Sequence, residues 1–541
     1  MTHLVQDLWF LPALLYAETH YRFPGFFSLL KKNEPEVIAD APHRLEPGQY
    51  LPLLILTKDA HLYPCRITDI SVEIRHGDSA VEKLDLLSNP LLPAGKFFWR
   101  IFPIDVSSFD GWIEVDVKLT LERKGKSKSY HNDNHRGSSH RPLRVFVSKN
   151  ALPRFPDLYL GDPHTHSHLT DDQVEFGVPL LPGRTLAHAM GLSYYCVTDH
   201  SYDLDDHQDS YLTNDPDLIR WKGFQSEVDQ LNNESKEFVI VRGEEVSCQN
   251  KQGENVHFLL FGQKEFVCGS GDSAERWLQT TSELNVAEVL ERRTNGAAAY
   301  AAHAKEPVPF LQRLLLSRGI WEDADLALDG MTGFQMINGR LDACFQNGYQ
   351  AWTRLLLQGK KLYVLAGDDA HGNFNRYRQI GVPFVSIRER DDQIFGRMRT
   401  GLFVDGQINE STLLWSLRHG LAILTDGPIA RMTAKTETEE VAEIGGSVRG
   451  NKLELTIEAL STPEFGEISS VAVVVGKVGT TAEQTAYTFG GNQGFTLHKQ
   501  LALSQAAVSY VRVEIWTSAI NAFDHQRHFC ITNPIWLDPP R

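Results

Sequence analysis

The stretch GDPHTHSHLT, Gly161–Thr170, places three histidines within five residues, directly after the short apolar run of residues 158–160. An apolar run bounded by glycine and polar residues is typical of a buried strand. Imidazoles add little to an apolar core, so their concentration where this strand ends indicates a functional site. The fold can be predicted from how often an apolar strand is followed by such polar residues elsewhere in the chain.

The same pattern recurs along the middle of the chain. Five strand candidates end in imidazoles or carboxylates: His164 and His166, Asp199 and His200, Glu244 and Glu245, His303, and Asp368, Asp369 and His371. His257 lies instead at the start of its apolar run. Helical stretches separate several of these strands, and such alternation favours a parallel sheet or a barrel. We therefore expect a β/α barrel, a fold that builds its active site at the carboxyl ends of its strands.

The residue types at these strand ends predict a metal site. Histidine nitrogens and carboxylate oxygens are the ligands of catalytic Zn²⁺, Mn²⁺ and Fe²⁺. So many carboxylates and imidazoles close together would be electrostatically strained unless cations lie among them. The six cysteines are scattered without a C-x-x-C pair, which disfavours both a disulfide framework and a thiolate zinc site.

The flanks of this region have a different pattern. Short runs of alternating apolar and polar residues fill about residues 46–147 and predict an antiparallel β-sandwich of immunoglobulin-like size. Strand-like runs return from about residue 430. The predicted fold class is therefore α/β, with a central distorted β/α barrel flanked by N-terminal and C-terminal all-β, sandwich-like domains. The predicted segments are an extension (1–45), a sandwich (46–150), the barrel (151–425) and a β-rich domain (426–541).

Composition narrows the classes of function. The 541 residues are 42% hydrophobic and 23% charged, as in ordinary globular proteins with sizeable cores. The formal net charge of −16 argues against a broad nucleic-acid surface, which needs a basic face. The apolar run Leu8–Ala17 is too short to span a bilayer, and no basic segment precedes it. We therefore expect a cytoplasmic protein without a membrane or nucleic-acid partner.

Five motifs occur in the order expected for one known superfamily. They are H-T-H (164–166), T-D-H-S (198–201), G-E-E (243–245), A-H-A (302–304) and G-D-D-A-H (367–371). Together they resemble the PHP superfamily, named after polymerase and histidinol phosphatase, over roughly residues 156–383. The later stretches LRHGLAILTDGP (417–428) and ITNPIWL (531–537) resemble its carbaryl-hydrolase-like branch. The resemblance implies that the expected barrel is of the PHP type.

The resemblance also implies a site of two or three divalent transition metals. The first metal would be held by His164, His166 and Asp369, the second by Glu245 as a bridge with His257 and His303, and the third by His200, His371 and an acid. The sequence reads Thr170, Asp171 and Asp172 where the superfamily usually has S-D-G, and Asp171 is preferred to Asp172 as that acid.

The implied chemistry is hydrolysis. A water that bridges two cations loses its proton near neutral pH and attacks phosphorus or a carbonyl carbon. His200, Asp369 or His371 would protonate the leaving group. Phosphoester hydrolysis is typical of the superfamily, so a phosphoesterase is the first hypothesis. The resemblance to the carbaryl-hydrolase-like branch makes carbamate or aryl-ester hydrolysis the alternative.

The substrate is expected to be a small-molecule ester that carries negative charge. Lys305 closely follows His303, and Arg340 follows the strand candidate 332–337, so either cation would suit an anionic group. A scaffold protein with a structural metal is a further alternative, although structural zinc sites favour closed four-ligand cages, often with cysteine. The sequence leaves the oligomeric state and the roles of the flanking β domains open.

Overall fold

The computed structural model describes residues 33–539, except for residues 78, 136–137, 172–176, 209, 272, 274–279, 376, 382–385 and 505–506. The chain divides into two compact units, each made of several segments. The first unit holds residues 1–151, 166–191 and 370–395, and the second holds residues 152–165, 192–369 and 396–541. The division into four consecutive segments stays a prediction.

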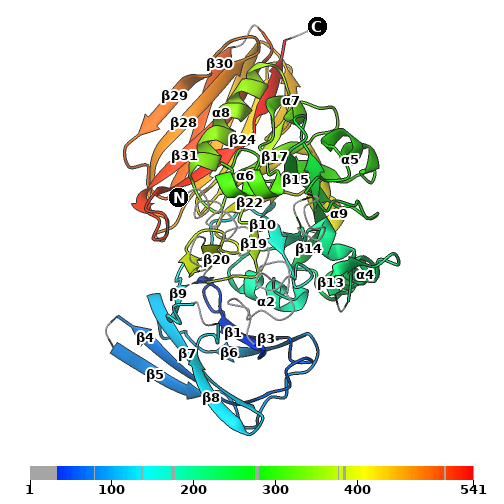
Figure 1. The fold of residues 1–541 in the computed structure, drawn as a ribbon. Coiled ribbons are helices and arrows are strands. Elements are labelled where there is room, and N and C mark those ends of the chain that lie inside the picture. Colours follow the sequence, from blue (N-terminus) through cyan, green and yellow to red (C-terminus); the bar gives the residue numbers. More distant parts are fainter. Residues whose placement is uncertain are drawn as a thin grey trace, which may run out of the picture. The chain divides into compact units, whose positions relative to one another are not determined.

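The first unit is built mainly from antiparallel strands. One sheet has the order β2-β9-β7-β4-β5, with β8 also paired to β7, and a second has the order β1-β3-β6 (Figure 1). The strands are β1 (Glu36–Asp40), β2 (Arg44–Leu45), β3 (Leu51–Lys58), β4 (Arg66–His76), β5 (Ser79–Asp85), β6 (Phe97–Ile104), β7 (Gly111–Arg123), β8 (Lys126–His131), β9 (Leu143–Val147), β19 (Ala370–His371), β20 (Tyr377–Gly381) and β21 (Ser386–Arg390). Helix α2 (Leu180–Ala189) packs near β3.

Strand β7 shows why this sequence forms a sheet with one buried face. Ile113, Val115 and Val117 are buried, whereas Glu114 and Lys118 between and after them are exposed. Because side chains alternate between the two faces of a strand, this pattern directs one face into an apolar core. The same alternation continues along β4, its antiparallel neighbour.

The second unit contains a long mixed sheet. Its order is β18-β17-β16-β15-β14-β11-β10-β22-β23-β32-β31-β28-β29, with β33 also paired to β31 and β26 to β33. The strands are β10 (Leu158–His166, whose last residue belongs to the first unit), β11 (Tyr194–Val197), β14 (Val239–Gln249), β15 (Asn255–Phe261), β16 (Ala298–Ala301), β17 (Gly333–Asn338), β18 (Tyr363–Gly367), β22 (Arg399–Phe403), β23 (Ala422–Thr425), β26 (Ser447–Arg449), β28 (Ile468–Lys477), β29 (Gln484–Gly490), β31 (Ser509–Ile520), β32 (Arg527–Thr532) and β33 (Ile535–Asp538).

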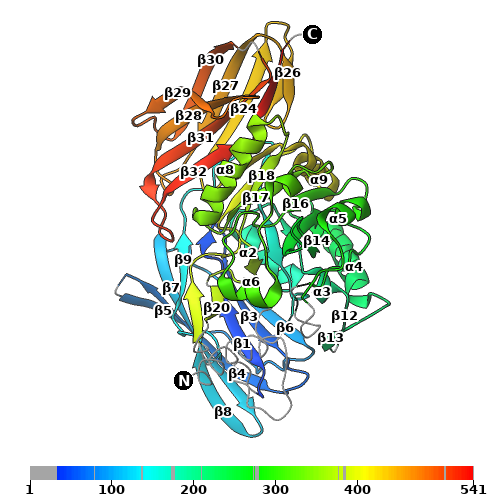
Figure 2. The same ribbon diagram turned by 45° about the horizontal axis from the view of Figure 1, so that its top comes forward.

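A four-stranded sheet and the helices complete the second unit. The sheet has the order β25-β24-β27-β30, from β24 (Ile429–Thr436), β25 (Val441–Glu443), β27 (Lys452–Leu460) and β30 (Thr496–Ser504); β12 (Asp206–His207) and β13 (Ser210–Asn214) form a separate pair. The helices are α3 (Ser201–Leu204), α4 (Ile219–Glu234), α5 (Val286–Arg292), α6 (Phe310–Leu316), α7 (Asp323–Leu326), α8 (Ala343–Leu357) and α9 (Glu410–His419). Figure 2 shows α8 beside β17, and in the described part of the chain no helix is long and apolar enough to cross a bilayer.

The expectation of a central β/α barrel is wrong. Strand accounts for 44% of the structure and helix for only 15%. In the described residues, the middle strands follow an open path that continues into the C-terminal strands. The physical reason is visible at β14 and β15, which pair antiparallel through a short hairpin, whereas a β/α barrel needs parallel strands joined by helices. The antiparallel pairs β15 with β16 and β10 with β22 break the pattern again.

Three neighbouring strands still bring polar strand ends to one edge. Strands β10, β11 and β14 are parallel to one another. The carboxyl ends of parallel neighbours meet at the same edge of a sheet. His164 lies near the end of β10, His200 follows β11, and Glu245 lies within β14, where it bridges to His200. The parallel order of the three strands therefore places these residues together.

A buried ion pair fastens the C-terminal strands of the second unit. His528 Nδ1 lies 2.7 Å from Asp426 Oδ2, and Asp426 also accepts from the backbone N–H of Phe529 at 2.9 Å. Burial opposes the charge of both groups, yet the pair raises the pKa of His528 and lowers the pKa of Asp426. The stabilisation from His528 is therefore fully present below its unfolded pKa of about 6.5 and lost as pH rises through its folded pKa.

We predict that His528→Gln lowers the free energy of unfolding by about 3 kcal/mol at pH 5.5, because one partner of a buried pair is removed. The difference from wild type should shrink toward pH 9, because the stabilisation is lost as pH rises through the folded pKa of His528. Urea unfolding at the two pH values measures this. His498→Gln is the matched control, since His498 lies 3.7 Å from Glu458 with 61% of its side chain exposed. An equal loss at both pH values would contradict the prediction.

Candidate metal centre

Glu245 lies at the centre of the candidate site. It belongs to β14, whose residues from Val239 to Cys248 are all buried, and its own exposed fraction is 0%. Within the ladder it pairs with Leu259 of β15. A carboxylate at such a position must be neutralised or surrounded by positive groups, because burial strongly disfavours an unpaired charge.

Four imidazoles surround the Glu245 carboxylate. His257 Nδ1 lies 2.7 Å from Oε1, and His200 Nδ1 lies 3.0 Å from Oε2. His303 Nε2 lies 3.3 Å from Oε1, and His164 Nε2 lies 3.4 Å from Oε2. The imidazoles come from the end of β10, the turn after β11, the start of β15 and the turn after β16, so four separate segments converge on one carboxylate.

Asp369 adds a second carboxylate to this group. Its Oδ1 lies 3.3 Å from His164 Nε2, so His164 stands between Glu245 and Asp369. Asp369 and His303 both have positive φ angles, of 51° and 26°. Left-handed backbone is unfavourable for residues other than glycine and is often held at functional sites. We call His164, His200, Glu245, His257, His303 and Asp369 the Glu245 cluster.

Gln335 of β17 fixes the orientation of His164. Its Oε1 accepts the backbone N–H of His303 at 3.0 Å, which identifies that atom as the amide oxygen. His164 Nδ1 lies 2.8 Å from the same oxygen and must therefore donate to it. Because Nδ1 donates to Gln335, Nε2 is the ring nitrogen of His164 that faces the two carboxylates. Sequence reasoning missed Gln335, because a lone glutamine within an apolar strand carries no motif.

A buried pair of carboxyl groups holds the backbone behind the cluster. Asp162 Oδ1 accepts the N–H groups of His164 at 3.1 Å and of Asp368 at 3.2 Å. Asp368 in turn accepts from the backbone of Arg397 at 2.8 Å. Burial raises the pKa of Asp162 to about 6 and that of Asp368 well above its usual range, so the two share a proton as a hydrogen-bonded pair. The pair ties β10 to the turn that carries Asp369.

The charges of the cluster balance one another. Burial alone would raise the pKa of Glu245, but His257, His164 and His200 hold it well below the ordinary value. Burial likewise opposes the charge of His164, yet Asp369 and Glu245 raise its pKa to about 10. Glu245 thus stays ionised, which is the state in which a carboxylate binds a cation.

The donor atoms fit a transition metal. The ligand atoms of His200, Glu245 and His257 lie within 4.8 Å of one another, and so do those of His164, Glu245 and Asp369. Imidazole nitrogen and carboxylate oxygen suit Zn²⁺, Mn²⁺ and Fe²⁺, and the cluster contains no thiolate of the kind common in structural zinc sites. The donor atoms of the cluster are therefore of the types that could hold such an ion.

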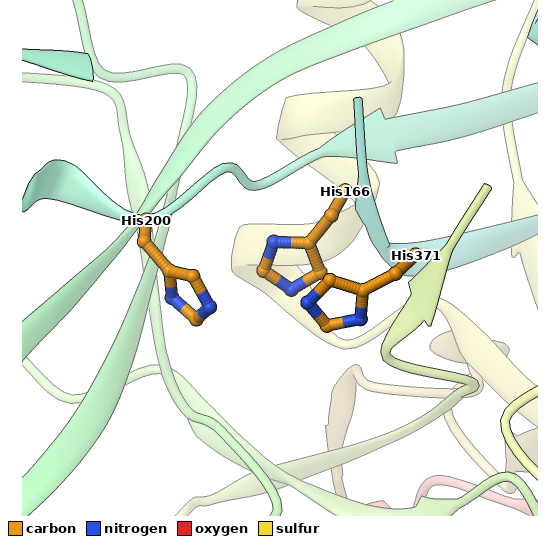
Figure 3. A group of neighbouring side chains, drawn as sticks. All are labelled: His166, His200 and His371. Carbon is orange, nitrogen blue, oxygen red and sulfur yellow. The ribbon is translucent and has the colours of Figure 1, made fainter. Parts of the chain in front are cut away.

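Three further candidate ligands belong to the first unit. The rings of His166 and His371 are stacked, with centroids 4.1 Å apart and planes 8° apart (Figure 3). Asp171 forms ion pairs with Lys58, at 2.5 Å, and with Lys96. Despite burial, the two lysines lower the pKa of Asp171 to about 2. Its charge is therefore balanced by ammonium groups, an arrangement that needs no metal. Its alternative, Asp172, lies outside the described residues.

The two predicted substrate cations have protein partners. Lys305 donates to Asp323 Oδ1 at 2.9 Å and to the carbonyl of Trp321. Arg340 donates to Asp342 Oδ2 at 3.2 Å, beside the first turn of α8. Neither contact is made to the Glu245 cluster. Arg318, a cation that sequence reasoning missed, does contact the Glu245 cluster, because its Nη1 lies 2.7 Å from His257 Nε2.

No family model matches this sequence, and no curated protein matches it significantly. Solved structures show only remote likeness. An α-2-macroglobulin from Escherichia coli has 6% identity and a TM-score of 0.16. The match covers 94% of this chain but only 24% of the macroglobulin. A Parabacteroides merdae β-glucuronidase has 10% identity and a TM-score of 0.17. The match covers 94% of this chain and 65% of the glucuronidase. A Paenibacillus cycloisomaltooligosaccharide glucanotransferase has 9% identity and a TM-score of 0.17. The match covers 93% of this chain and 71% of the glucanotransferase.

We predict that Glu245→Gln weakens zinc binding by more than about 100-fold, because loss of a central ligand should exceed the 10–100-fold cost of losing an outer partner. Titration of metal-stripped protein with Zn²⁺ measures the affinity. Glu244→Gln is the control: Glu244 faces away from its neighbour along the strand and accepts from Val267 N at 3.5 Å. Burial holds the pKa of Glu244 well above its ordinary value, and glutamine conserves the size of its side chain. Equal zinc affinity in the two variants would contradict the assignment.

Proposed function

We propose that this chain is a metal-dependent hydrolase whose first substrate class is phosphate esters. The observation that carries the proposal is the convergence of four imidazoles and Asp369 on the buried carboxylate of Glu245. The order of the five histidine and carboxylate motifs, which resembles that of the PHP superfamily, supports the same class. The proposal concerns the site and not a barrel fold.

The Glu245 cluster supplies the metal ligands in this proposal. When bound, divalent metals would lower the pKa of a water and neutralise charge on the reacting ester. Glu245 is the bridging carboxylate because both of its oxygens face imidazoles: Oε1 faces His257 and His303, and Oε2 faces His164 and His200. Gln335 keeps His164 in the tautomer that presents Nε2.

Two residues at the more open side of the cluster are suited to proton transfer. Asp369 keeps 14% of its side chain exposed and His200 keeps 11%, whereas Glu245 and His164 are fully buried. The ring of His200 also stacks on Tyr202, with centroids 4.6 Å apart, which fixes its orientation. We assign the protonation of the leaving oxygen to Asp369 or His200, because a general acid must reach both the substrate and water.

Aryl-ester or carbamate hydrolysis is the second candidate. Phe310 and Leu314 on α6 are 66% and 58% exposed, a short distance along the chain from His303. Exposed aromatic and aliphatic side chains suit the apolar part of an aryl substrate. The first candidate is preferred because the cluster gathers imidazoles and would hold metals, and both favour an anionic ester.

We predict that purified protein carries two or three equivalents of Zn²⁺, Mn²⁺ or Fe²⁺, and that p-nitrophenyl phosphate is cleaved faster than p-nitrophenyl acetate. Elemental analysis and the two colour assays measure this. His257→Ala should abolish turnover, because an imidazole beside Glu245 is lost. His188→Ala is the matched control, since His188 is exposed on α2.

Protein without bound metal and without turnover after metal is added would refute the proposed function and favour a scaffold role. Metal-dependent cleavage of the acetate alone would replace the first substrate class with the second.

A further inference from the structure

Two arginines lie at the amino ends of the parallel neighbours β16 and β17. Arg418 belongs to the last turn of α9, a helix that packs on β16 (Figure 2), and its Nη1 lies 3.8 Å from the position that a Cβ would take at Gly296. Arg293 follows the last residue of α5, and its Nη1 donates to Gly330 O at 2.5 Å. Gly296 lies shortly before β16 and Gly330 shortly before β17, and these two strands are paired. The fold therefore gathers two positive charges where the chain enters these strands.

The charges of these two guanidiniums are not balanced by the protein. Burial and the positive charge of Arg418 lower the pKa of Arg293, and among the described residues no carboxylate raises it. In the same part of the chain, neither arginine forms an ion pair with a carboxylate. Arg418 Nε is also buried, and it has no hydrogen-bond partner among the described residues. A buried donor without an acceptor and two like charges side by side both cost free energy, and an anion between the two side chains would remove both costs.

Other arginines of the second unit are balanced by carboxylates. Arg354 lies in the last turn of α8 and donates to Asp323 Oδ2 through Nε at 3.1 Å and through Nη2 at 2.9 Å. Arg242 donates through Nε to Glu410 Oε1 and through Nη2 to Glu410 Oε2, both at 2.9 Å. The carbonyl groups at the end of a helix attract a cation, but Arg354 shows that a place in the last turn does not exclude a carboxylate partner. The lack of such a partner at Arg418 is therefore a feature of this position and not of helix ends in general.

We propose that Arg293 and Arg418 form an anion site that binds a phosphate group at the amino ends of β16 and β17. A phosphate group carries about two negative charges near neutral pH and so matches the two guanidiniums. Its oxygens can accept hydrogen bonds from both planar side chains at once, whereas a carboxylate brings only one charge. The site is separate from the Glu245 cluster, because His303 of that cluster follows the opposite, carboxyl end of β16. The inference therefore does not depend on the proposed function.

Calorimetric titration of the purified protein with inorganic phosphate tests the proposal. Arg418→Ala and Arg293→Ala should each weaken phosphate binding by at least about tenfold, because the charge-assisted hydrogen bonds of one guanidinium are lost. Arg418→Lys, which keeps the charge but not the planar fork, should bind with intermediate affinity. Arg354→Ala is the matched control, since Arg354 also lies in the last turn of a helix but has a carboxylate partner. This control should bind phosphate like wild type.

Glu245→Gln separates this site from the metal cluster, because it should still bind phosphate at the arginine pair. Titration of that variant with glycerol 3-phosphate identifies the source of the phosphate group: tighter binding than inorganic phosphate indicates a phosphate ester, and weaker binding indicates the free ion. Wild-type protein that binds no phosphate would overturn the proposal. So would phosphate binding that is lost in Glu245→Gln but kept in Arg418→Ala, or in Arg418→Lys where the alanine variant does not fold.

Discussion

The buried charge of Glu245 constrains the architecture around it. A carboxylate with no exposed surface on a central strand is costly unless positive groups lie close to it on several sides. Four imidazoles meet that need here, and each is delivered by a different segment of the second unit. The strands that deliver them cannot shift independently, because moving one would leave the carboxylate partly unpaired.

The groups behind the ligands explain how this geometry is kept. Gln335 bonds the backbone of His303 and the ring of His164, so it couples two ligands through one amide oxygen. The Asp162–Asp368 pair holds the backbone of His164 and the turn before Asp369. Such outer contacts set the tautomer and direction of metal ligands. They also hold the left-handed backbone of His303 and Asp369, which a short polypeptide would not adopt unaided.

Local sequence patterns predicted many residues of the candidate site, but they did not predict the order and direction of the strands. Polar residues at strand ends predicted that His164, His200 and Glu245 would meet, and they do because β10, β11 and β14 are parallel neighbours. The barrel was wrong because an apolar run reveals a strand but not the direction of its partner. Residues 250–254, between β14 and β15, are too few for a crossover helix between parallel strands, and such a short connection indicates a hairpin.

Contacts between distant segments could not be predicted. Asp171 pairs with Lys58 and Lys96, which lie far from it in the sequence, so the pattern around the histidine motif gives no sign of these ion pairs. The contact of Arg318 with His257 likewise depends on how the end of α6 bonds to β15.

The metal role of the cluster itself stays a prediction. X-ray absorption at the metal edge of the loaded protein tests it most directly. We predict nitrogen and oxygen neighbours at about 2.0–2.2 Å, lost in Glu245→Gln, whereas sulfur neighbours at about 2.3 Å or a spectrum unchanged by that substitution would contradict the account.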